Sequence, residues 1–268
     1  MDFDLPADLQ AYLAELDGFI AREIAPLQAQ DDNVRFFDHR REWARTDFEA
    51  GGLPRPEWEA LLREAQKCAD RAGHWRFSAP RKYGGQDGAN LWMAVIRDHF
   101  ARQGLGLHND LQNEHSIVGN FPFVAMFEHF GTPAQQQEFI LGGFEHTRRV
   151  AFGLTEPEHG SDATHMATRA VPEARNGVAG WRIDGEKMWT TGMHTATHCA
   201  TFARTSGSDG SARGISCFLV PNPCEGLVIE EYLWTFNMPT DHPRVSFSGV
   251  WVPESALLGP LDGGLALA

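Results

Sequence analysis

The chain has 268 residues, a length that can bury a hydrophobic core in one or two domains. Hydrophobic residues make up 42% of the sequence, as in ordinary globular proteins, and the formal net charge is -13. Such an excess of negative charge argues against nucleic acid or an anionic membrane as the main partner.

The cysteines and the N-terminal residues indicate the compartment in which the protein works. Cys68, Cys199, Cys217 and Cys224 are scattered and form no CxxC pair, so we interpret them as reduced thiols. The acidic start, MDFDLPADLQ, has neither the basic region of a signal peptide nor the arginines of a transit peptide. No apolar run is long enough to span a bilayer. We therefore expect a cytoplasmic protein without a membrane segment.

Helical periodicity dominates the first half of the chain. Between residues 6 and 30, apolar residues recur at steps of three and four, which is the stripe of a helix that packs by one face. The stripe consists of Leu9, Leu13, Leu16, Ile20 and Ile24. Pro56 begins a second helix, and a third extends from Asn90 to about Arg102.

The helical character continues beyond Gly106 through Phe130, with one break at Phe121-Pro122. Thr132 is then a good N-cap and Pro133 a good first helical residue, which predicts a helix to about Leu141. Residues 1–147 are therefore predicted to form an all-helical domain.

The periodicity changes near Arg148. From there to Trp251 the apolar runs are short and bounded by turns, which is typical of strands. The runs are RRVAFGL, THMATRAV, GWRI, KMWTT, HCATFA, ISCFLV, LVIEEYL and RVSFSGVWV. Asp184-Gly185 predicts a hairpin turn between the third and the fourth. This spacing favours an antiparallel β-barrel or sandwich, so we assign residues 148–258 to a β domain and the protein to the α+β class.

The sequence ends in the first turn of a new apolar segment. After LDGG, a helix is predicted to begin at Leu265, and it stops at Ala268 without a polar cap. We therefore expect residues 259–268 to be a linker and the stub of a further helical domain that this chain lacks.

The segment Ala151–Asp162, AFGLTEPEHGSD, has the pattern of a strand followed by a ligand-binding loop. Thr155 places a hydroxyl at the end of the strand, which stops because Pro157 cannot continue a sheet ladder. Gly160 permits a positive φ, so the N–H groups around Gly160 and Ser161 can converge on an anion, helped by the Ser161 hydroxyl. This pattern predicts a phosphate site that needs no basic side chain.

A second segment, KMWTTG at residues 187–192, offers an aromatic ring and hydroxyl groups. Trp189 and Thr191 share one face if the segment is a strand, so an indole and a hydroxyl would meet a ligand together. A flat aromatic ligand with a polar edge would suit this pair.

These two segments resemble those of the flavin-dependent acyl-CoA dehydrogenases. The shared features are the LTEPxxGSD loop and the W-x-T segment, and four further matches follow in the family's order. They are PRKYGG at residues 80–85, FGTPAQQQEFI at 130–140, the Ala203-Arg204 pair and VPESALLG at 252–259. The resemblance implies a helical domain followed by a β domain.

The resemblance also implies an FAD site built from both segments. The implied cofactor residues are Phe152, Leu154, Thr155, Gly160, Ser161, Trp189, Thr190 and Thr191. The first three and the last three would contact the isoalloxazine, with Thr191 near its N5 atom. Gly160 and Ser161 would meet the pyrophosphate, and Ser161 would also lie near the pantetheine arm of an acyl-CoA substrate.

Members of this family remove the α-proton of an acyl-CoA with a carboxylate base and transfer the β-hydrogen as hydride to flavin N5, giving an enoyl-CoA. The reduced flavin then passes its electrons to an acceptor such as an electron-transfer flavoprotein. A later helical domain usually carries the base and builds a dimer or tetramer interface. The resemblance therefore implies a homo-oligomer for the intact protein and no catalytic residue in this chain. We interpret Glu156 and Asp162 as acids that fix turns of the loop or stay solvated.

Two departures from the family pattern concern the pocket rim. Residues 191–194, TGMH, stand where many relatives have Thr-Asn-Gly, and the TDHP turn at residues 240–243 differs from that of the best-known short- and medium-chain members. We therefore expect an unusual acyl group.

Two alternatives stay open. One is a non-catalytic flavin- or acyl-CoA-binding module of the same fold. The other is a metal enzyme, because His194 and His198 are spaced i, i+4 and His159 and His165 lie on the first segment. That spacing brings two imidazoles together only on a helix, and no HExxH glutamate accompanies it, so a metal-ligand role is not favoured.

Overall fold

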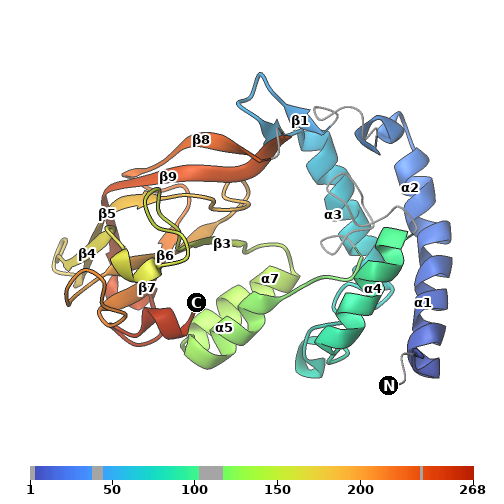
Figure 1. Ribbon diagram of the computed structural model, residues 1–268, viewed down its shortest axis with the longest axis horizontal. Coiled ribbons are helices and arrows are strands. Elements are labelled where there is room, and N and C mark those ends of the chain that lie inside the picture. The colour runs from blue at the N-terminus through green and yellow to red at the C-terminus, as the bar shows by residue number, and fades with distance from the viewer. Residues whose placement is uncertain (1–3, 38–44, 103–116, 236–237) are drawn as a thin grey trace. The chain divides into compact units, whose positions relative to one another are not determined.

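The α-helices come before the strands of the main sheet along the chain, as Figure 1 shows for the computed structural model. The structure describes residues 4–37, 45–102, 117–235 and 238–268. The chain divides into two compact units, Met1–Asp47 with Pro54–Phe121, and Phe48–Leu53 with Pro122–Ala268. None of the helices in the described ranges is both long and apolar enough for a membrane span.

The helices of the first unit confirm the sequence periodicity. They are α1 (Ala7–Phe19), α2 (Ala25–Ala29), α3 (Pro56–Arg71) and α4 (Asn90–Arg102), and a π-helical turn, Ile20–Ile24, joins α1 to α2. All five residues of the predicted apolar stripe are buried. Pro56 lies in the first turn of α3, where its missing N–H costs no helical hydrogen bond. Of the helical stretch predicted after Gly106, residues 106–116 lie outside the described part.

A capping box starts the helical segment that leads into the sheet. The helices of the second unit are α5 (Pro122–Phe130), α6 (Pro133–Gln135), a π-helical turn (Gln136–Leu141) and α7 (Gly142–Phe144). The Gln135 N–H donates to Thr132 Oγ1, and the Thr132 N–H donates to Gln135 Oε1. The Gln135 amide also donates to the carbonyls of Ser255 and Leu257. The predicted N-cap is confirmed, and the same glutamine ties the helix to the end of the sheet.

The second unit contains a mostly antiparallel sheet. Its strands are β3 (Val150–Gly153), β4 (Arg169–Pro172), β5 (Gly180–Lys187), β6 (His198–Arg204), β7 (Ile215–Pro221), β8 (Leu227–Thr235), β9 (Met238–Pro253) and β10 (Leu257–Leu258). The order is β10-β7-β6-β4-β5-β9-β8, and β3 lies beside β6 off this path. The pairs β3–β6 and β4–β6 are parallel. A separate two-stranded sheet joins β1 (Thr46–Asp47) and β2 (Leu53–Pro54).

The predicted closed barrel is wrong, because the sheet of the described residues is open. Closure requires continuous hydrogen bonding between the two edge strands, which here are β10 and β8. The β10 edge consists of Leu257 and Leu258, which pair with β7, so it offers too few positions to join a nine-residue strand.

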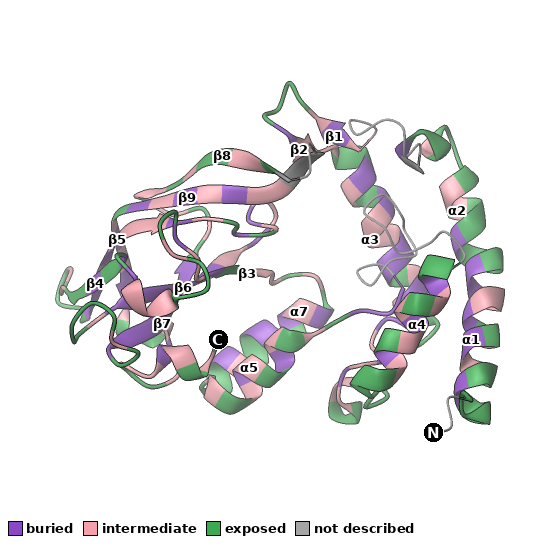
Figure 2. Cartoon of the chain, in the orientation of Figure 1, coloured by how far each residue is buried: buried purple, intermediate pink, exposed green. Residues whose placement is uncertain are grey.

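Strands β6 and β7 carry the core of the sheet. Residues 199–204 and 215–220 are all buried, and Figure 2 shows the buried residues in purple. A strand that is covered on both faces has a continuous apolar run rather than an alternating one. This explains why HCATFA and ISCFLV show no period of two.

The predicted hairpin at Asp184-Gly185 is also wrong. Strand β5 continues through these residues and pairs with β9 on both sides of them, with a register shift between Ile183 and Gly185. Gly185 has a φ of +147°, and a Cβ there would lie 2.5 Å from Thr168 Oγ1, so only glycine fits this bulge. The Gly249 N–H donates to Asp184 Oδ1 at 2.7 Å, which occupies the side chain that would have shaped a turn.

The type of secondary structure changes between Phe144, where α7 ends, and Val150, where β3 begins. At the other end, Gly264–Ala266 forms a 3-10 turn where the sequence predicts the start of a helix. The domain limits at residues 147 and 258 and the linker role of residues 259–268 stay predictions.

Replacement of Thr132 tests the capping box. Thr132→Ala should lower the free energy of unfolding by about 1 kcal/mol, because the Gln135 N–H loses its acceptor. Thr132→Ser keeps the hydroxyl and should stay close to the wild type. Urea denaturation of the three proteins measures both changes, and an equal loss for Ala and Ser would show that the hydroxyl does not cap the helix.

Candidate functional site

The first segment leaves the sheet at the end of β3. Ala151 is buried, whereas Phe152 is 42% exposed and its ring centroid lies 4.9 Å from that of Phe202. Gly153 is needed for close packing, since a Cβ there would lie 2.8 Å from Cys199 Sγ. Thr155 follows β3, and its carbonyl accepts the Met188 N–H at 2.8 Å. This hydrogen bond joins the two sequence segments directly.

A buried ion pair holds the segments together beneath this contact. Lys187 Nζ donates to Glu156 Oε1 at 2.8 Å and to the Leu154 carbonyl at 3.2 Å. The Lys187 side chain is fully buried and that of Glu156 is 6% exposed. Glu156 also accepts the N–H groups of Ala167 at 2.6 Å and Thr168 at 2.9 Å. Glu156 therefore fixes the loop from inside, so the solvated alternative is wrong for this acid.

The pair stays ionised at neutral pH. Burial alone would raise the pKa of the Glu156 carboxyl, but the charge and hydrogen bond of Lys187, with the donors from Thr168 and Ala167, outweigh it and hold the pKa below its usual value. Burial lowers the pKa of Lys187 to about 8 against the attraction of Glu156. Glu156 is thus a structural anion and not a free base. Sequence reasoning missed Lys187, because it ends a strand of mixed polar and apolar residues, GWRIDGEK, and nothing local marks its side chain as buried.

The loop after Glu156 presents Ser161 to solvent. Gly160 and Ser161 are exposed, and the Ser161 hydroxyl makes no hydrogen bond to any described residue. Asp162 Oδ1 accepts the N–H and the hydroxyl of Thr164 at 3.0 and 2.5 Å, which caps a 3-10 turn. The prediction that Gly160 adopts a positive φ is wrong. Reciprocal backbone hydrogen bonds between Glu156 and His159 and the Asp162 cap make the turns instead.

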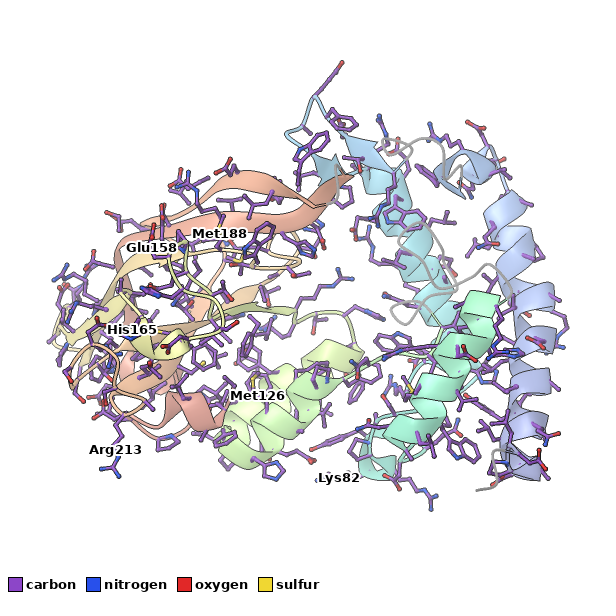
Figure 3. The ribbon with its side chains drawn as sticks, in the orientation of Figure 1. Lys82, Met126, Glu158, His165, Met188 and Arg213 are labelled. Atoms are coloured by element: carbon purple, nitrogen blue, oxygen red, sulfur yellow. The ribbon has the colours of Figure 1, made fainter. Side chains whose placement is uncertain are left out.

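A second loop, residues 205–214, supports the first one. His165 Nδ1 lies 3.2 Å from Asp209 Oδ2, and the Gly210 N–H donates to the Thr164 carbonyl. Arg204 is buried, and its guanidinium donates to the Thr164 carbonyl at 2.5 Å and to carbonyls of the second loop. Figure 3 labels His165 and Glu158 on the first loop and Arg213 on the second. Arg204, part of one matched pair, thus fixes two loops at once.

The W-x-T segment is not a strand, so the predicted shared face of Trp189 and Thr191 is wrong. Strand β5 ends at Lys187, and Trp189 has a φ of +62°, which is rare for a bulky residue. The reason is that the backbone bonds to two elements in succession. The Met188 N–H donates to Thr155 beyond β3, and the Thr190 N–H donates to the Pro243 carbonyl of β9.

Because the backbone passes from Thr155 to β9, the side chains of Trp189, Thr190 and Thr191 lie in different surroundings. The Trp189 indole is 41% exposed, which is a large fraction for an aromatic residue. Thr190 is fully buried, and its Oγ1 has no hydrogen-bond partner among the described residues. Thr191 is exposed, and its Oγ1 lies 2.8 Å from His242 Nδ1. An exposed indole and an unsatisfied buried hydroxyl are features of a site that a ligand completes.

The metal alternative loses its geometric basis. His198 lies in β6 and His194 in the turn before it, so they do not share a helix face. The His198 ring packs against Phe139 at 4.8 Å. His159 and His165 stack on each other at 5.4 Å. The described part of the chain holds no group of three or more histidines, cysteines or acids that could bind a metal ion.

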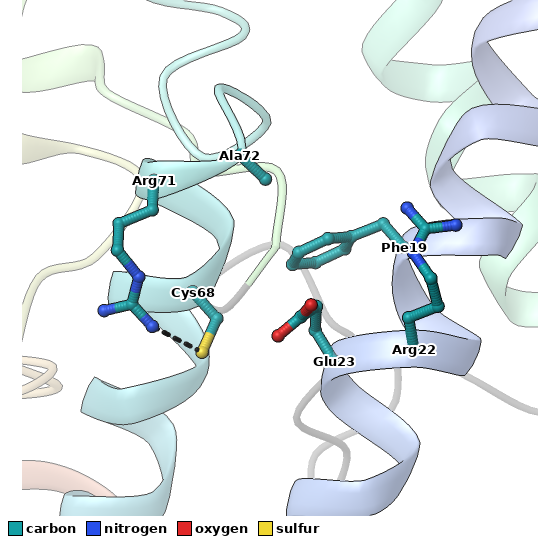
Figure 4. Close-up of a pocket in the computed structure, with 6 residues that line it drawn as sticks. All are labelled: Phe19, Arg22, Glu23, Cys68, Arg71 and Ala72. Carbon is teal, nitrogen blue, oxygen red and sulfur yellow. Dashed lines mark hydrogen bonds between the residues drawn. The ribbon is translucent and has the colours of Figure 1, made fainter.

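A cavity of about 270 Å³ lies in the first unit, apart from all motif residues. It is lined by Phe19, Arg22, Glu23, Cys68, Arg71 and Ala72 (Figure 4). Arg71 Nη2 donates to Cys68 Sγ at 3.1 Å, but burial raises the pKa of the Cys68 thiol, which disfavours the reactive thiolate form. The cavity therefore offers no chemistry for the motifs.

Comparisons with known proteins show which family the chain resembles. Residues 151–250 match the family described as "Acyl-CoA dehydrogenase, middle domain". A 3-(aryl)acrylate reductase of Clostridium sporogenes is 28% identical over 209 residues, and a glutaryl-CoA dehydrogenase of Desulfococcus multivorans is 26% identical over 277 residues. The chain belongs to the acyl-CoA dehydrogenase family.

The alignments cover most of this family member but only part of its relatives. They span 77% of the chain and 52% of the reductase, and 98% of the chain and 60% of the glutaryl-CoA dehydrogenase. A solved putative acyl-CoA dehydrogenase of Mycobacterium abscessus has the same fold, with a TM-score of 0.76 at 23% identity over 99% of this chain and 63% of that one. The chain thus spans little more than half the length of these two curated relatives.

The buried pair of this family member can be tested by two variants. Lys187→Met should lower the free energy of unfolding by about 3–5 kcal/mol, because it leaves the Glu156 charge buried and unpaired. The double variant Glu156→Gln/Lys187→Met should be clearly more stable than Lys187→Met, since no charge is buried and the amide carbonyl introduced at position 156 can still accept one of the two N–H groups. Chemical denaturation measures both. A double variant as unstable as the single one would refute the unpaired-charge explanation.

Acid should weaken the fold of this family member through Glu156. The folded pKa of Glu156 is depressed below the unfolded value of about 4.3, so its contribution to stability is complete above that value and is lost as the pH falls through the folded pKa. The urea midpoint should therefore drop more steeply with falling pH below about 5 in the wild type than in Glu156→Gln. Parallel curves for the two proteins would show that Glu156 titrates normally.

Proposed function

We propose that this chain forms the flavin-binding wall of an FAD-dependent acyl-CoA dehydrogenase, which converts an acyl-CoA to an enoyl-CoA. The observation that carries the proposal is the junction of the two segments at the Met188–Thr155 hydrogen bond, which leaves the Trp189 indole exposed and the Thr190 hydroxyl unsatisfied beside it. A flat ring system would cover the indole, and its polar edge could pair with the exposed Thr191 hydroxyl of the same segment.

The side chains at this junction suit an isoalloxazine. Phe152 and Trp189 offer exposed aromatic surface, and Leu154 lies between β3 and the ion pair. Thr155, Thr190 and Thr191 add hydroxyl groups that can donate where negative charge develops on a ring during reduction. When bound, FAD would supply the acceptor for the electrons and the β-hydrogen of the substrate.

The loop side of the site suits the phosphates. Ser161 has an exposed hydroxyl without a partner among the described residues, and Gly160 before it leaves its surroundings open, since a Cβ there would meet nothing within 4 Å. We assign both residues to the FAD pyrophosphate, and Ser161 also to the pantetheine arm of the acyl-CoA. The two-loop support by Arg204 and His165 would hold them in place.

We assign the catalytic base to no residue of this chain. Glu156 is excluded because it is buried, paired with Lys187 and lowered in pKa, so it can neither reach a substrate nor hold its proton. Asp162 is engaged by Thr164, whose hydrogen bonds hold the Asp162 pKa below its usual value. The base, the electron acceptor, such as an electron-transfer flavoprotein, and the homo-oligomer interface are proposed for the intact enzyme.

The alternative is a non-catalytic module of the same fold that binds flavin or acyl-CoA. It is favoured by the same absence of a usable base among the acids of the first loop. The two functions share the binding wall, so binding alone does not separate them. Reduction of a bound flavin by an acyl-CoA does.

Binding of FAD tests the wall directly. Trp189→Ala should weaken FAD binding roughly 3- to 10-fold, since an aromatic stack contributes about 0.5–1.5 kcal/mol beyond burial. Trp234→Ala is the matched control, because Trp234 is an exposed tryptophan, at 54%, that belongs to β8 and to neither segment. Equilibrium titration followed by flavin fluorescence gives the affinities.

Equal losses in both tryptophan variants, or no binding by the wild type, would overturn the assignment. Addition of a panel of acyl-CoAs under anaerobic conditions then tests the base. Residues 1–268 should bind FAD without bleaching of its absorbance, and bleaching would show that a base lies within this chain.

A further inference from the structure

The segment Asp241–Pro243 in β9 is the platform of the W-x-T segment. The Thr190 N–H donates to the Pro243 carbonyl at 3.1 Å, and the Gly192 N–H donates to the Asp241 carbonyl at 3.0 Å. Between these two backbone contacts, Thr191 Oγ1 lies 2.8 Å from His242 Nδ1. Three consecutive residues of one segment thus pair with three of the other, and the central pair joins a hydroxyl to an imidazole.

We propose that His242 is a positioning residue that sets the direction of the Thr191 hydroxyl and thereby couples the state of a bound flavin to a proton on the imidazole. The flavin part of this inference rests on the proposed function, in which Thr191 lies near N5. The hydrogen-bond part rests on the chain alone.

The reasoning starts from the single proton of the Thr191 hydroxyl. If His242 Nδ1 carries no proton, it accepts that hydrogen, and Thr191 presents only lone pairs to a ligand. If His242 Nδ1 is protonated, it donates to Thr191 Oγ1, and the Thr191 hydrogen is free to donate elsewhere. The Trp189 carbonyl, at 3.5 Å, is a longer and weaker alternative acceptor.

The N5 atom of a flavin would need the Thr191 hydroxyl as a donor when the ring is oxidised and as an acceptor when it is reduced. In the oxidised ring N5 is an acceptor, so Thr191 must donate to it, which requires a proton on His242 Nδ1. In the reduced ring N5 carries a hydrogen, so Thr191 must accept, and its own proton can then turn to His242. His242 contacts Thr191, and its imidazole can change between hydrogen-bond donor and acceptor.

The surroundings of His242 allow this exchange. Its side chain is 32% exposed, so water can deliver and remove protons, and Asp241 Oδ1 lies 3.5 Å from its Nδ1 atom. On β8, Tyr232 has a pKa raised by burial and by Asp241, and its ring faces His194 at 6.4 Å. Arg244 lies two residues after His242 on β9, and its guanidinium forms ion pairs with two carboxylates.

The partners of Arg244 are Glu231 on β8, at 3.0 Å, and Glu186 on β5, at 3.1 Å. These two ion pairs balance the Arg244 charge. Asp241 Oδ1 and Thr191 Oγ1 both lie close to the Nδ1 atom of His242, at 3.5 and 2.8 Å.

The hydrogen bond is tested first without flavin. Nitrogen-15 NMR of the chain gives the protonation and tautomer of His242 across a pH titration. Thr191→Val should shift the titration midpoint and the ratio of Nδ1-H to Nε2-H forms of His242, whereas Thr191→Ser should reproduce the wild type. Thr197→Val is the matched control, because Thr197 Oγ1 lies 3.1 Å from the different imidazole of His198. A His242 titration unchanged by Thr191→Val would overturn the inference.

The coupling to flavin is tested next by potentiometry. In the FAD-loaded wild type, the plot of flavin midpoint potential against pH should bend at the pKa that NMR gives for His242, and the bend should vanish in His242→Phe. Straight, parallel plots for the two proteins would refute the coupling even if FAD binds normally. If the wild type binds no FAD, the proposed function fails, and the NMR comparison of Thr191→Val with Thr191→Ser decides the role of His242.

Discussion

The buried ion pair between Glu156 and Lys187 is the interaction on which the site depends. Two charges removed from water are tolerated only when each has its partner and the remaining hydrogen-bonding positions are filled. Here Lys187 is the partner of Glu156, and the N–H groups of Ala167 and Thr168 donate to the same carboxylate. Because Glu156 belongs to the loop after β3 and Lys187 ends β5, satisfaction of the charges fixes where both segments end. The Met188–Thr155 hydrogen bond follows directly from that position.

The strained Trp189 is a consequence of the same arrangement. Once Met188 is bonded to Thr155, the chain must turn to reach β9, and a left-handed residue at position 189 makes the turn. Such a conformation costs of order 1–3 kcal/mol for a bulky residue, and it persists because hydrogen bonds on both sides impose it. An exposed indole and an unsatisfied Thr190 hydroxyl are then a cost to the unliganded chain that a flavin would offset.

Local signals in the sequence predicted the helices, and long-range pairing decided the errors. The Leu9 stripe, Pro56 and the Thr132 cap act within a few residues, so they could be interpreted from the sequence. Asp184-Gly185 has the composition of a turn, but pairing with β9 on both sides makes it a bulge. Lys187 and Glu156 are 31 residues apart, and nothing local indicates their contact. The family motifs selected two segments that the structure joins by the Met188–Thr155 hydrogen bond. The strand assigned to Trp189 and Thr191 failed because β5 already ends at Lys187.

A crystal structure of the chain with FAD bound tests the central claim most directly. The account predicts the isoalloxazine against the Trp189 indole, with hydroxyl groups of Thr155 and Thr191 within hydrogen-bonding distance of its polar edge, and the pyrophosphate at Ser161. It also predicts that Glu156 and Lys187 keep the contact they have without the cofactor. FAD bound elsewhere on the chain, with Trp189 still exposed to solvent, would contradict the account.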